Sequence, residues 1–356
     1  MKNLYYATFP NGYSLIIEKF IKKQDKNAFV KAMYADAVLF FADEHFPFSN
    51  TMFFETYLVL DYQKRARDNS LYSSQHKTKF SLEHQKKIAD GAVNSQIKHL
   101  LERKDLRIYF PKEVKKIRIN YRSEQEQKLQ INPKLRNAFE TMISKLTKKR
   151  VGYFETNGEL DIFVKNNGDS IFVKRITREN TEFSKFRNNY SLQPEIAFAL
   201  NFLSNPCEKE VSLDPFSENG MISYVRAFSF KKANVIANEE NKDNIPEIKA
   251  LAKKLKEKSF SVMNYDFLSN NFPIKFIDKI VTVLPNFVSS QSAFFEKAYM
   301  LKVKKIVVLC SASTMINQLV TKFYDVKESY ENLYNLLVPV SFRKEQKIYV
   351  LELKKD

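Results

Sequence analysis

The fold is decided by one stretch of the chain, Val211-Ser212-Leu213-Asp214-Pro215-Phe216-Ser217-Glu218-Asn219-Gly220-Met221-Ile222. It begins as a short apolar strand and runs into an acidic turn that Pro215 marks. Gly220 then precedes a second apolar run. A strand, a tight turn and a helix N-terminus in this order form the cofactor cradle of doubly wound α/β domains. The stretch therefore predicts such a domain, with a cofactor site at its first turn.

The chain beyond about Asn189 alternates strands with helices, which is typical of βαβ units and a mostly parallel sheet. The predicted strands are Glu210 to Leu213, Asn234 to Ala237, Ser261 to Met263, Lys279 to Val283 and Lys305 to Cys310. A final pair, near Tyr334 to Phe342 and Lys347 to Leu353, is typical of an antiparallel hairpin. The expected fold class of this half is α/β.

The first half of the chain mixes short β-rich runs with amphipathic helices. Its opening segment predicts a strand (Leu4 to Phe9), a helix (Tyr13 to Lys22) and two further apolar runs (Ala32 to Phe41 and Thr51 to Asp61). Their spacing indicates a small α+β unit. The basic run Gln63 to Arg67 then ends this unit, either as a solvated face or as a phosphate contact.

A second β-rich region follows. Residues Lys115 to Arg122 alternate apolar and basic side chains, so a strand there would present a row of cations that could contact phosphates. Asn132 and Pro133 are suited to cap a following helix. That helix is expected to bury Leu135, Phe139, Met142 and Leu146. The Asn-Gly step at 167–168 predicts a hairpin joining Leu160 to Val164 with Ser170 to Lys174.

Chain length limits the number of domains, and net charge limits the kinds of binding partner. A chain of 356 residues exceeds one usual hydrophobic core, so we expect two or three domains. With 58 Lys and Arg against 41 Asp and Glu, the net charge of +17 would attract a polyanion such as RNA, or an acidic membrane surface. The same charge also follows from the abundance of Lys, Asn, Ile and Phe that AT-rich genomes impose. Charge alone therefore does not establish nucleic-acid binding.

Several other classes are disfavoured. Cys207 and Cys310 lie far apart without partners at metal-binding spacing, which predicts a reducing compartment and no zinc site. His45, His76, His84 and His99 likewise lack the spacing of a metal or nucleophilic site. Walker-type, Gly-x-Ser-x-Gly and kinase motifs are absent from the sequence.

No stretch of the sequence approaches the ~18 uncharged apolar residues of a membrane span, and the N-terminus does not resemble a signal peptide. We therefore expect a cytoplasmic protein without a membrane partner. The sequence predicts no particular oligomeric state.

Two motifs of the second half resemble the methyltransferase domain of the THUMP-containing RNA methyltransferases. The run Ser191-Leu192-Gln193-Pro194-Glu195-Ile196-Ala197-Phe198-Ala199-Leu200 carries the family's L-x-P-x-x-A pattern. Asp214-Pro215-Phe216 then matches the start of its D-P-F-C-G-S-G-T-I loop. The likeness covers residues 186–356, and it extends to the first half only in the pattern of strands and helices.

This resemblance implies three domains: a ferredoxin-like segment (1–62), a THUMP-like RNA-binding domain (63–178) and a seven-stranded, Rossmann-like methyltransferase domain (185–356). It also implies transfer of a methyl group from S-adenosylmethionine to a guanine exocyclic amine in tRNA or rRNA.

The family's first loop falls on residues 214–220. There the resemblance implies that Asp214 binds the ammonium of the cofactor and that Phe216 and Gly220 line its site. Glycines in this loop let the main chain approach the methionine part of the cofactor. Here Glu218 replaces the first glycine and Asn219 the serine, so only Gly220 remains. The side chain of Glu218 could fill the pocket.

The next two strand ends carry the remaining cofactor residues that the resemblance implies. Glu239 stands where the family has an acid that accepts both ribose hydroxyls. Asp266 and Phe267 stand where it has an acceptor for the adenine amine and an apolar neighbour of the ring. Taken singly, each acid could equally be a helix cap or a solvated loop residue.

The fourth strand end departs most from the family, which has Asn/Asp-Pro-Pro-aromatic there. The matching run is Val283-Leu284-Pro285-Asn286-Phe287. Val283 and Leu284 offer no side-chain acceptor for a target amine. A shift of one or two residues would let Asn286 accept the amine and Phe287 stack on the base, beside Pro285.

Three hypotheses follow. The first is an RNA methyltransferase of the THUMP class. The second is a catalytically silent relative that serves as an RNA-binding or scaffold module, which Glu218 and the Val283-Leu284 pair favour. The third is a methyltransferase-like domain that acts on a protein or small molecule, which the basic first half disfavours.

Overall fold

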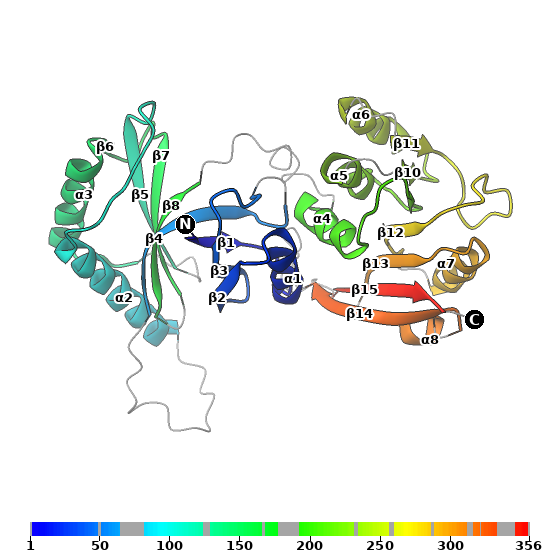
Figure 1. Ribbon diagram of the computed structural model, residues 1–356, viewed down its shortest axis with the longest axis horizontal. Helices are drawn as coiled ribbons and strands as arrows, with labels where there is room; N and C mark the ends of the chain where they lie inside the picture. The colour runs from blue at the N-terminus through cyan, green and yellow to red at the C-terminus, as the bar shows by residue number, and fades with distance from the viewer. Residues whose placement is uncertain are drawn as a thin grey trace, which may run out of the picture. The chain divides into compact units, whose positions relative to one another are not determined.

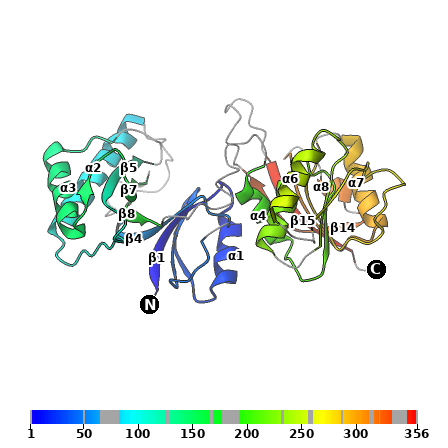
Figure 2. The same ribbon diagram turned by 90° about the horizontal axis from the view of Figure 1, so that it is seen from above.

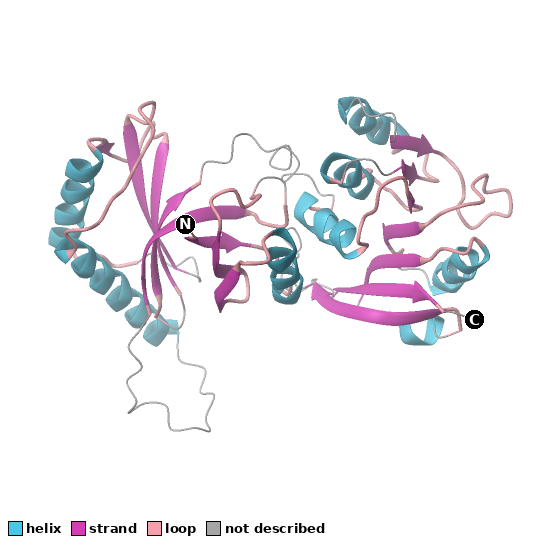
Figure 3. Cartoon of the chain, viewed as in Figure 1, coloured by secondary structure: helices cyan, strands magenta, loops and turns pink. Residues whose placement is uncertain are grey.

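The computed structural model describes residues 2–48, 51–64, 82–123, 129–165, 168–176, 192–230, 234–255, 260–285, 288–311, 316–320, 322–332 and 346–354. Two sheets and their helices make up this part of the chain (Figures 1 and 3). The chain divides into two compact units. The first comprises Met1–Tyr6, Phe40–Glu44 and Glu55–Thr177, and the second comprises Ala7–Leu39, His45–Phe54 and Arg178–Asp356. The division into three domains expected from the sequence stays a prediction.

The first sheet has eight strands in the order β2-β3-β1-β4-β8-β7-β5-β6. They are β1 (Asn3–Thr8), β2 (Phe29–Met33), β3 (Ala37–Ala42), β4 (Glu55–Gln63), β5 (Lys116–Ser123), β6 (Arg150–Val151), β7 (Gly158–Val164) and β8 (Ser170–Arg175). The apolar run expected at Ala32 to Phe41 is thus parts of two strands, joined by a turn in which the Tyr34 N–H donates to the Ala37 carbonyl (2.8 Å). The predicted hairpin of β7 and β8 is confirmed, and Gly168 has the positive φ (+84°) that its turn requires.

Helices α2 (Leu82–Glu102) and α3 (Pro133–Thr147) pack on the first sheet through a shared apolar cluster. Asn132 caps α3 as predicted, with its side chain accepting from the Lys134 N–H (3.0 Å). The helix buries Phe139, Ile143 and Thr147 rather than Leu146, which is 43% exposed. The buried residues recur every fourth position on one side of the helix, and Leu146 lies about 60° from the mean direction of that row, near the end of the helix.

The basic row predicted on β5 is partly neutralised. Arg122 Nε lies 2.9 Å from Asp161 Oδ1 on β7, and the Asp161 side chain is fully buried. Burial raises the pKa of the Asp161 carboxyl to about 6. Arg118 donates a hydrogen bond to the Tyr153 carbonyl. Two of the cations expected to meet phosphates therefore already have partners within the unit.

The second sheet has seven strands in the order β11-β10-β9-β12-β13-β15-β14. They are β9 (Val211–Asp214), β10 (Asn234–Asn238), β11 (Phe260–Met263), β12 (Lys279–Val283), β13 (Lys305–Ser311), β14 (Tyr324–Asn332) and β15 (Gln346–Leu353). The first five run parallel, while β15 runs antiparallel to both β13 and β14. The five predicted parallel strands are confirmed within one or two residues.

The partner of β15 is not where the sequence suggested. It is β14, at Tyr324–Asn332, whereas the strand expected at 334–342 lies outside the described residues. The sequence of β14 alternates poorly because this strand is the edge of the sheet, where charged residues such as Asp325, Lys327 and Glu328 discourage pairing with another chain.

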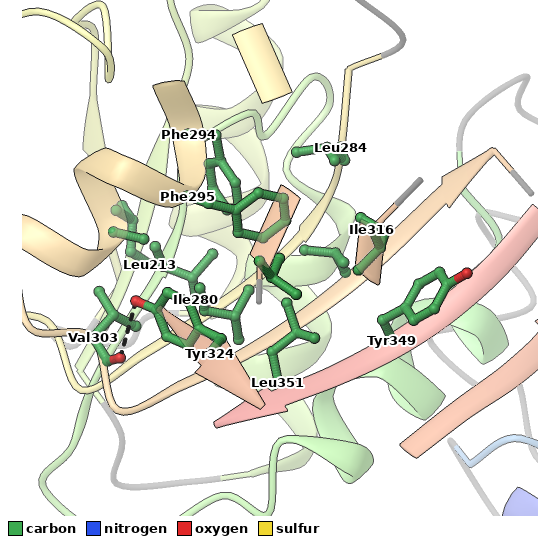
Figure 4. Close-up of a cluster of buried hydrophobic side chains, with 14 of the residues drawn as sticks. Leu213, Ile280, Leu284, Phe294, Phe295, Val303, Ile316, Tyr324, Tyr349 and Leu351 are labelled. Atoms are coloured by element: carbon green, nitrogen blue, oxygen red, sulfur yellow. Dashed lines mark hydrogen bonds between the residues drawn. The ribbon is translucent and has the colours of Figure 1, made fainter. Parts of the chain in front are cut away.

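Helices cover both faces of the second sheet (Figures 1 and 2). On one face, α4 (Pro194–Leu203) and α5 (Met221–Ser229) contact each other and the strands, and α6 (Ile245–Leu255) follows α5. On the other face, α7 (Val288–Met300) and α8 (Ile316–Val320) cover an apolar cluster that Figure 4 shows. Its members include Leu213, Ile280, Phe294, Phe295 and Leu351. At its edge the Tyr324 hydroxyl donates to the Val303 carbonyl (3.3 Å).

Helix α1 (Ser14–Gln24) belongs to the same compact unit as this sheet. Its Phe20 is fully buried and meets Phe198 and Phe202 of α4 edge to face, with ring centroids 5.7 and 5.6 Å apart. Lys19 on the opposite side of the helix forms an ion pair with Glu328 on β14 (2.5 Å). The N-terminal segment and the α/β half therefore share one core.

Candidate active site

Acidic residues follow the carboxyl ends of three neighbouring strands. Asp214 is the last residue of β9, Glu239 directly follows β10, and Asp266 lies three residues after β11. The register of the sheet pairs Asp214 with Ala237 and Asn238 with Met263, so the three strand ends lie side by side. Strand order reverses between β9 and β12, and ligands of open α/β sheets bind at that point, beyond the carboxyl ends. This edge is the candidate site.

Asp214 faces inward. Its side chain is 3% exposed, and Oδ1 accepts a hydrogen bond from the Thr282 hydroxyl on β12 (2.7 Å). Burial raises the pKa of this carboxyl to about 7, although bonds from Thr282 and from the Phe216 N–H oppose the shift. The carboxylate thus joins two strands across the reversal point. To bind a cofactor ammonium, as predicted from the sequence, the Asp214 carboxylate would have to give up its hydrogen bonds from Thr282 and the Phe216 N–H.

Glu218 takes the backbone conformation of the glycine it replaces. Its φ is +50°, in the left-handed region, and its side chain is exposed. The Glu218 N–H donates to Glu239 Oε2 (2.6 Å), and the Asn241 N–H donates to Glu239 Oε1 (2.9 Å). Both oxygens of Glu239 therefore hold loop backbone, while the residue itself is only partly buried. These two bonds hold the loop in its left-handed conformation at Glu218.

Asn238, which the sequence analysis missed, joins the three loops. It is fully buried at the end of β10. Its Nδ2 donates to the carbonyls of Pro215 (3.1 Å) and Tyr265 (2.9 Å), and its Oδ1 accepts from the Tyr265 N–H (3.2 Å). Its own carbonyl accepts from the Ser217 N–H (3.0 Å). Asn238 is thus the buried side chain that contacts both the loop after β9 and the loop after β11.

The residues after β11 divide between surface and core. Asp266 is exposed, and its Oδ1 accepts from the Leu268 N–H (2.8 Å) in a local turn. Phe267 is 2% exposed and packs with Phe216 and Phe294, with ring centroids 5.9 and 5.8 Å apart. Asp266 thus has its second oxygen available to a ligand. The Phe267 ring belongs to the apolar cluster of Figure 4, and Phe216 packs at its border.

Gly220 begins α5 with φ of +80°. A Cβ added there would lie 2.9 Å from the Ile248 side chain of α6. This glycine is therefore required both by its backbone conformation and by the close approach of two helices. These two requirements explain why it is retained without invoking a ligand.

The fourth strand end is described only in part. Pro285 is partly buried, and its carbonyl accepts from Gln291 Nε2 (2.9 Å). Asn286 and Phe287, the residues proposed to hold and stack on a base, lie outside the described residues.

The described ranges contain no group of three or more His, Cys, Asp or Glu residues arranged to hold a metal ion. Within the same ranges no helix combines the length and apolarity needed to cross a bilayer.

The chemistry of the edge fits the adenosine part of a cofactor better than its methionine part. Two neighbouring hydroxyls need a carboxylate, and an amine needs an acceptor; Glu239 and Asp266 supply these on adjacent loops. The buried and bonded Asp214 and the side chain at position 218 fit the methionine part less well. The arrangement places carboxylate acceptors for hydroxyl and amine donors along the strand ends.

Comparisons with known proteins give structural matches only. No protein-family model matches the chain, and no curated protein matches it. Among solved structures, TrmN from Thermus thermophilus is 13% identical, with a TM-score of 0.67 over 99% of this chain and 100% of that one. SMU.472, described as a candidate methyltransferase and solved with SAH, is 9% identical, with a TM-score of 0.66 over 100% and 99%.

A third match is described as a predicted N6-adenine-specific DNA methylase from Listeria monocytogenes. It is 10% identical, with a TM-score of 0.58 over 98% of this chain and 96% of that one. At such identities the matches show the fold. The expectation of a Rossmann-like, seven-stranded methyltransferase fold is confirmed.

Replacing Asn238 with alanine should destabilise the protein by about 2–4 kcal/mol, because buried backbone groups of Pro215 and Tyr265 lose their partner. Urea unfolding measures this loss. The control is Asn264→Ala at the same edge, where the amide bonds the carbonyls of Glu239 and Glu240 near solvent, and a loss of about 1 kcal/mol is expected. Equal losses in the two variants would contradict the central position of Asn238.

Asp214→Asn should change how stability depends on pH. The folded carboxyl has a pKa of about 7, above the ordinary value of about 3.9, so it holds its proton more tightly when folded. Its contribution is therefore complete at low pH and is lost as pH rises toward 7. The stability of the wild type relative to Asp214→Asn should fall by at most about 4 kcal/mol between pH 4 and pH 8.

Denaturant unfolding across that pH range measures the difference. Thr282→Val should steepen the fall, because the carboxylate loses the hydroxyl that stabilises its charged form. A difference that does not vary with pH would show that Asp214 titrates as an ordinary exposed acid.

Proposed function

We propose that this protein transfers a methyl group from S-adenosylmethionine to a guanine exocyclic amine in tRNA or rRNA. The observation that carries the proposal is the edge at β9, β10 and β11, where three successive parallel strands each lead to an acid beside the reversal point. The whole-chain fold match to TrmN supports the class, and the SAH in the SMU.472 structure supports the cofactor.

In this proposal Glu239 binds the ribose hydroxyls and Asp266 accepts the adenine amine. Glu239 would exchange at least one of its loop N–H bonds for a ribose hydroxyl, and Asp266 would use its available oxygen. The cofactor supplies an electrophilic methyl group. Four residues support the loops around the cofactor: Asp214, Gly220 and Phe267, which are buried, and Phe216, which is partly buried.

The amine to be methylated needs an acceptor and a ring to stack on. Pro285, Asn286 and Phe287 remain the residues proposed for this role, with the Asn286 amide as acceptor and the Phe287 ring against the base. Gln291 holds the Pro285 carbonyl, which fixes the start of this loop. RNA is the proposed polyanion for a chain of net charge +17, and THUMP-like recognition by residues 63–178 is part of the same proposal.

A second candidate function is an RNA-binding module without methyl transfer. Two features favour it. Glu218 has a left-handed backbone, and its N–H already donates a hydrogen bond to Glu239. In addition, Val283 and Leu284 provide no side-chain acceptor for a target amine. Cofactor binding distinguishes the two candidates.

Titration calorimetry should detect S-adenosylmethionine binding that Asp266→Ala weakens about tenfold, because a ligand amine is left without its acceptor. Asp325→Ala, which removes an exposed acid on β14, is the matched control and should leave the affinity unchanged. Glu218→Gly should bind more tightly than the wild type, since glycine takes the positive φ without strain and removes the side chain. No binding by either the wild type or Glu218→Gly at millimolar cofactor would leave the second candidate.

RNA affinity should fall steeply with salt, because each phosphate contact releases counterions. A fluorescently labelled tRNA, titrated at several salt concentrations, measures the slope of log K against log salt. A slope near zero would contradict RNA binding. If heparin of equal charge binds with the same affinity and the same slope as tRNA, the protein attracts any polyanion.

A further inference from the structure

A cavity of about 470 Å³ lies at the end of the second sheet where β9 begins. It is lined by α1, α4, the end of α5, Pro47, Thr51 and the segment around Pro206 that leads into β9. Gly220 starts α5 at the candidate active site, and Ser229 ends it at the cavity. A nine-residue helix is about 13 Å long, so the cavity is a separate place from the strand-end site.

The walls are aromatic. Five phenylalanines line the cavity: Phe20, Phe198, Phe202, Phe228 and Phe230. Phe20 meets Phe198 at 90° and Phe202 at 79°, and Phe198 and Phe230 have ring centroids 5.0 Å apart. Phe20 is fully buried and backs the cavity, whereas Phe228 and Phe230 are partly exposed and can pack against another flat ring. The volume is within the range of small-molecule sites.

Two polar groups of the lining, on Lys23 and Ser229, can contact a ligand. The Lys23 ammonium donates to Asn205 Oδ1 (2.8 Å) and lies 5.2 Å from the Phe202 ring centroid, and no carboxylate of the described chain lies within ion-pair distance of it. The Ser229 hydroxyl is buried, and within the described ranges it has no hydrogen-bond partner. A buried polar atom without a partner is unfavourable, so the Ser229 hydroxyl calls for a ligand atom, whereas the Lys23 ammonium is exposed and can meet a ligand at the rim of the cavity.

We propose that this cavity binds a small aromatic carboxylate. The ring packs among the phenylalanines, the carboxylate pairs with Lys23, and a polar atom of the ligand meets the Ser229 hydroxyl. The exposed Lys23 ammonium at the rim favours an anionic guest over a cationic one. The occupant would connect α1 to α4 and α5, because all three line the cavity. The proposal does not depend on methyl transfer, since no residue of the strand-end site takes part.

Calorimetry on the full chain tests the charge requirement with 3-phenylpropionate, 3-phenylpropanol and phenethylamine. The carboxylate should bind, the alcohol should bind about tenfold more weakly, and the amine should not bind measurably. Equal binding of all three, or none of the carboxylate at millimolar concentration, overturns the proposal.

Lys23→Met should weaken 3-phenylpropionate about tenfold and remove the salt dependence of its affinity. The matched control is Lys22→Met on the same helix, whose ammonium pairs with Glu18 (2.7 Å) and does not line the cavity. It should leave the affinity unchanged. Equal effects of the two substitutions would show a general charge effect and overturn the assignment.

Ser229→Ala tests whether the buried Ser229 hydroxyl contacts the ligand. It should raise the thermal midpoint of the free protein, because a buried hydroxyl without a partner is removed, and it should lower the stabilisation that 3-phenylpropionate provides. A lower midpoint would mean that the hydroxyl is already satisfied. Tighter binding of an Ala-Ala-Phe peptide than of 3-phenylpropionate would identify a protein C-terminus as the occupant and overturn the small-molecule proposal.

Discussion

The candidate active site depends on the side-chain amide of Asn238. A parallel sheet brings its strand ends to one edge, but the loops beyond those ends have no sheet hydrogen bonds to hold them. Asn238 supplies the missing bonds, because its amide reaches the loop after β9 in one direction and the loop after β11 in the other. Since the side chain is fully buried, each of these bonds is expensive to leave unmade. Together with the bonds of Glu239 to the Glu218 N–H and of Asn264 to the Glu239 carbonyl, this contact sets the relative positions of the three acids.

Burial then separates the acids into two kinds. Asp214 is buried below the edge, and its carboxyl accepts a hydrogen bond from Thr282 across the point where strand order reverses. Glu239 and Asp266 lie nearer to solvent and bond only to backbone N–H groups, which a ligand hydroxyl or amine can replace at modest cost. One inner carboxylate thus supports the sheet, and two outer carboxylates remain for recognition.

Sequence patterns predicted the parts of this molecule that follow from local rules. The five parallel strands, the Asn132 cap and the β7–β8 hairpin each have a period, a cap or a turn residue that acts within a few positions. Asn238 could not be found in this way, because an asparagine after an apolar strand looks like any loop residue until its distant partners are known. The edge strand β14 was missed because its charged residues and a bulge between Val326 and Glu328 interrupt the alternation, although Tyr324 and Tyr330 are buried.

The left-handed backbone at Glu218 has a consequence for how this loop can change over generations. Glutamate and glycine codons differ by a single base at the second position, so one point mutation exchanges the two residues. The main chain already has the required shape, and the neighbouring Glu239 and Asn238 bonds hold it there. Glutamate and glycine at this position are therefore one genetic step apart, and the backbone conformation of the loop suits either residue.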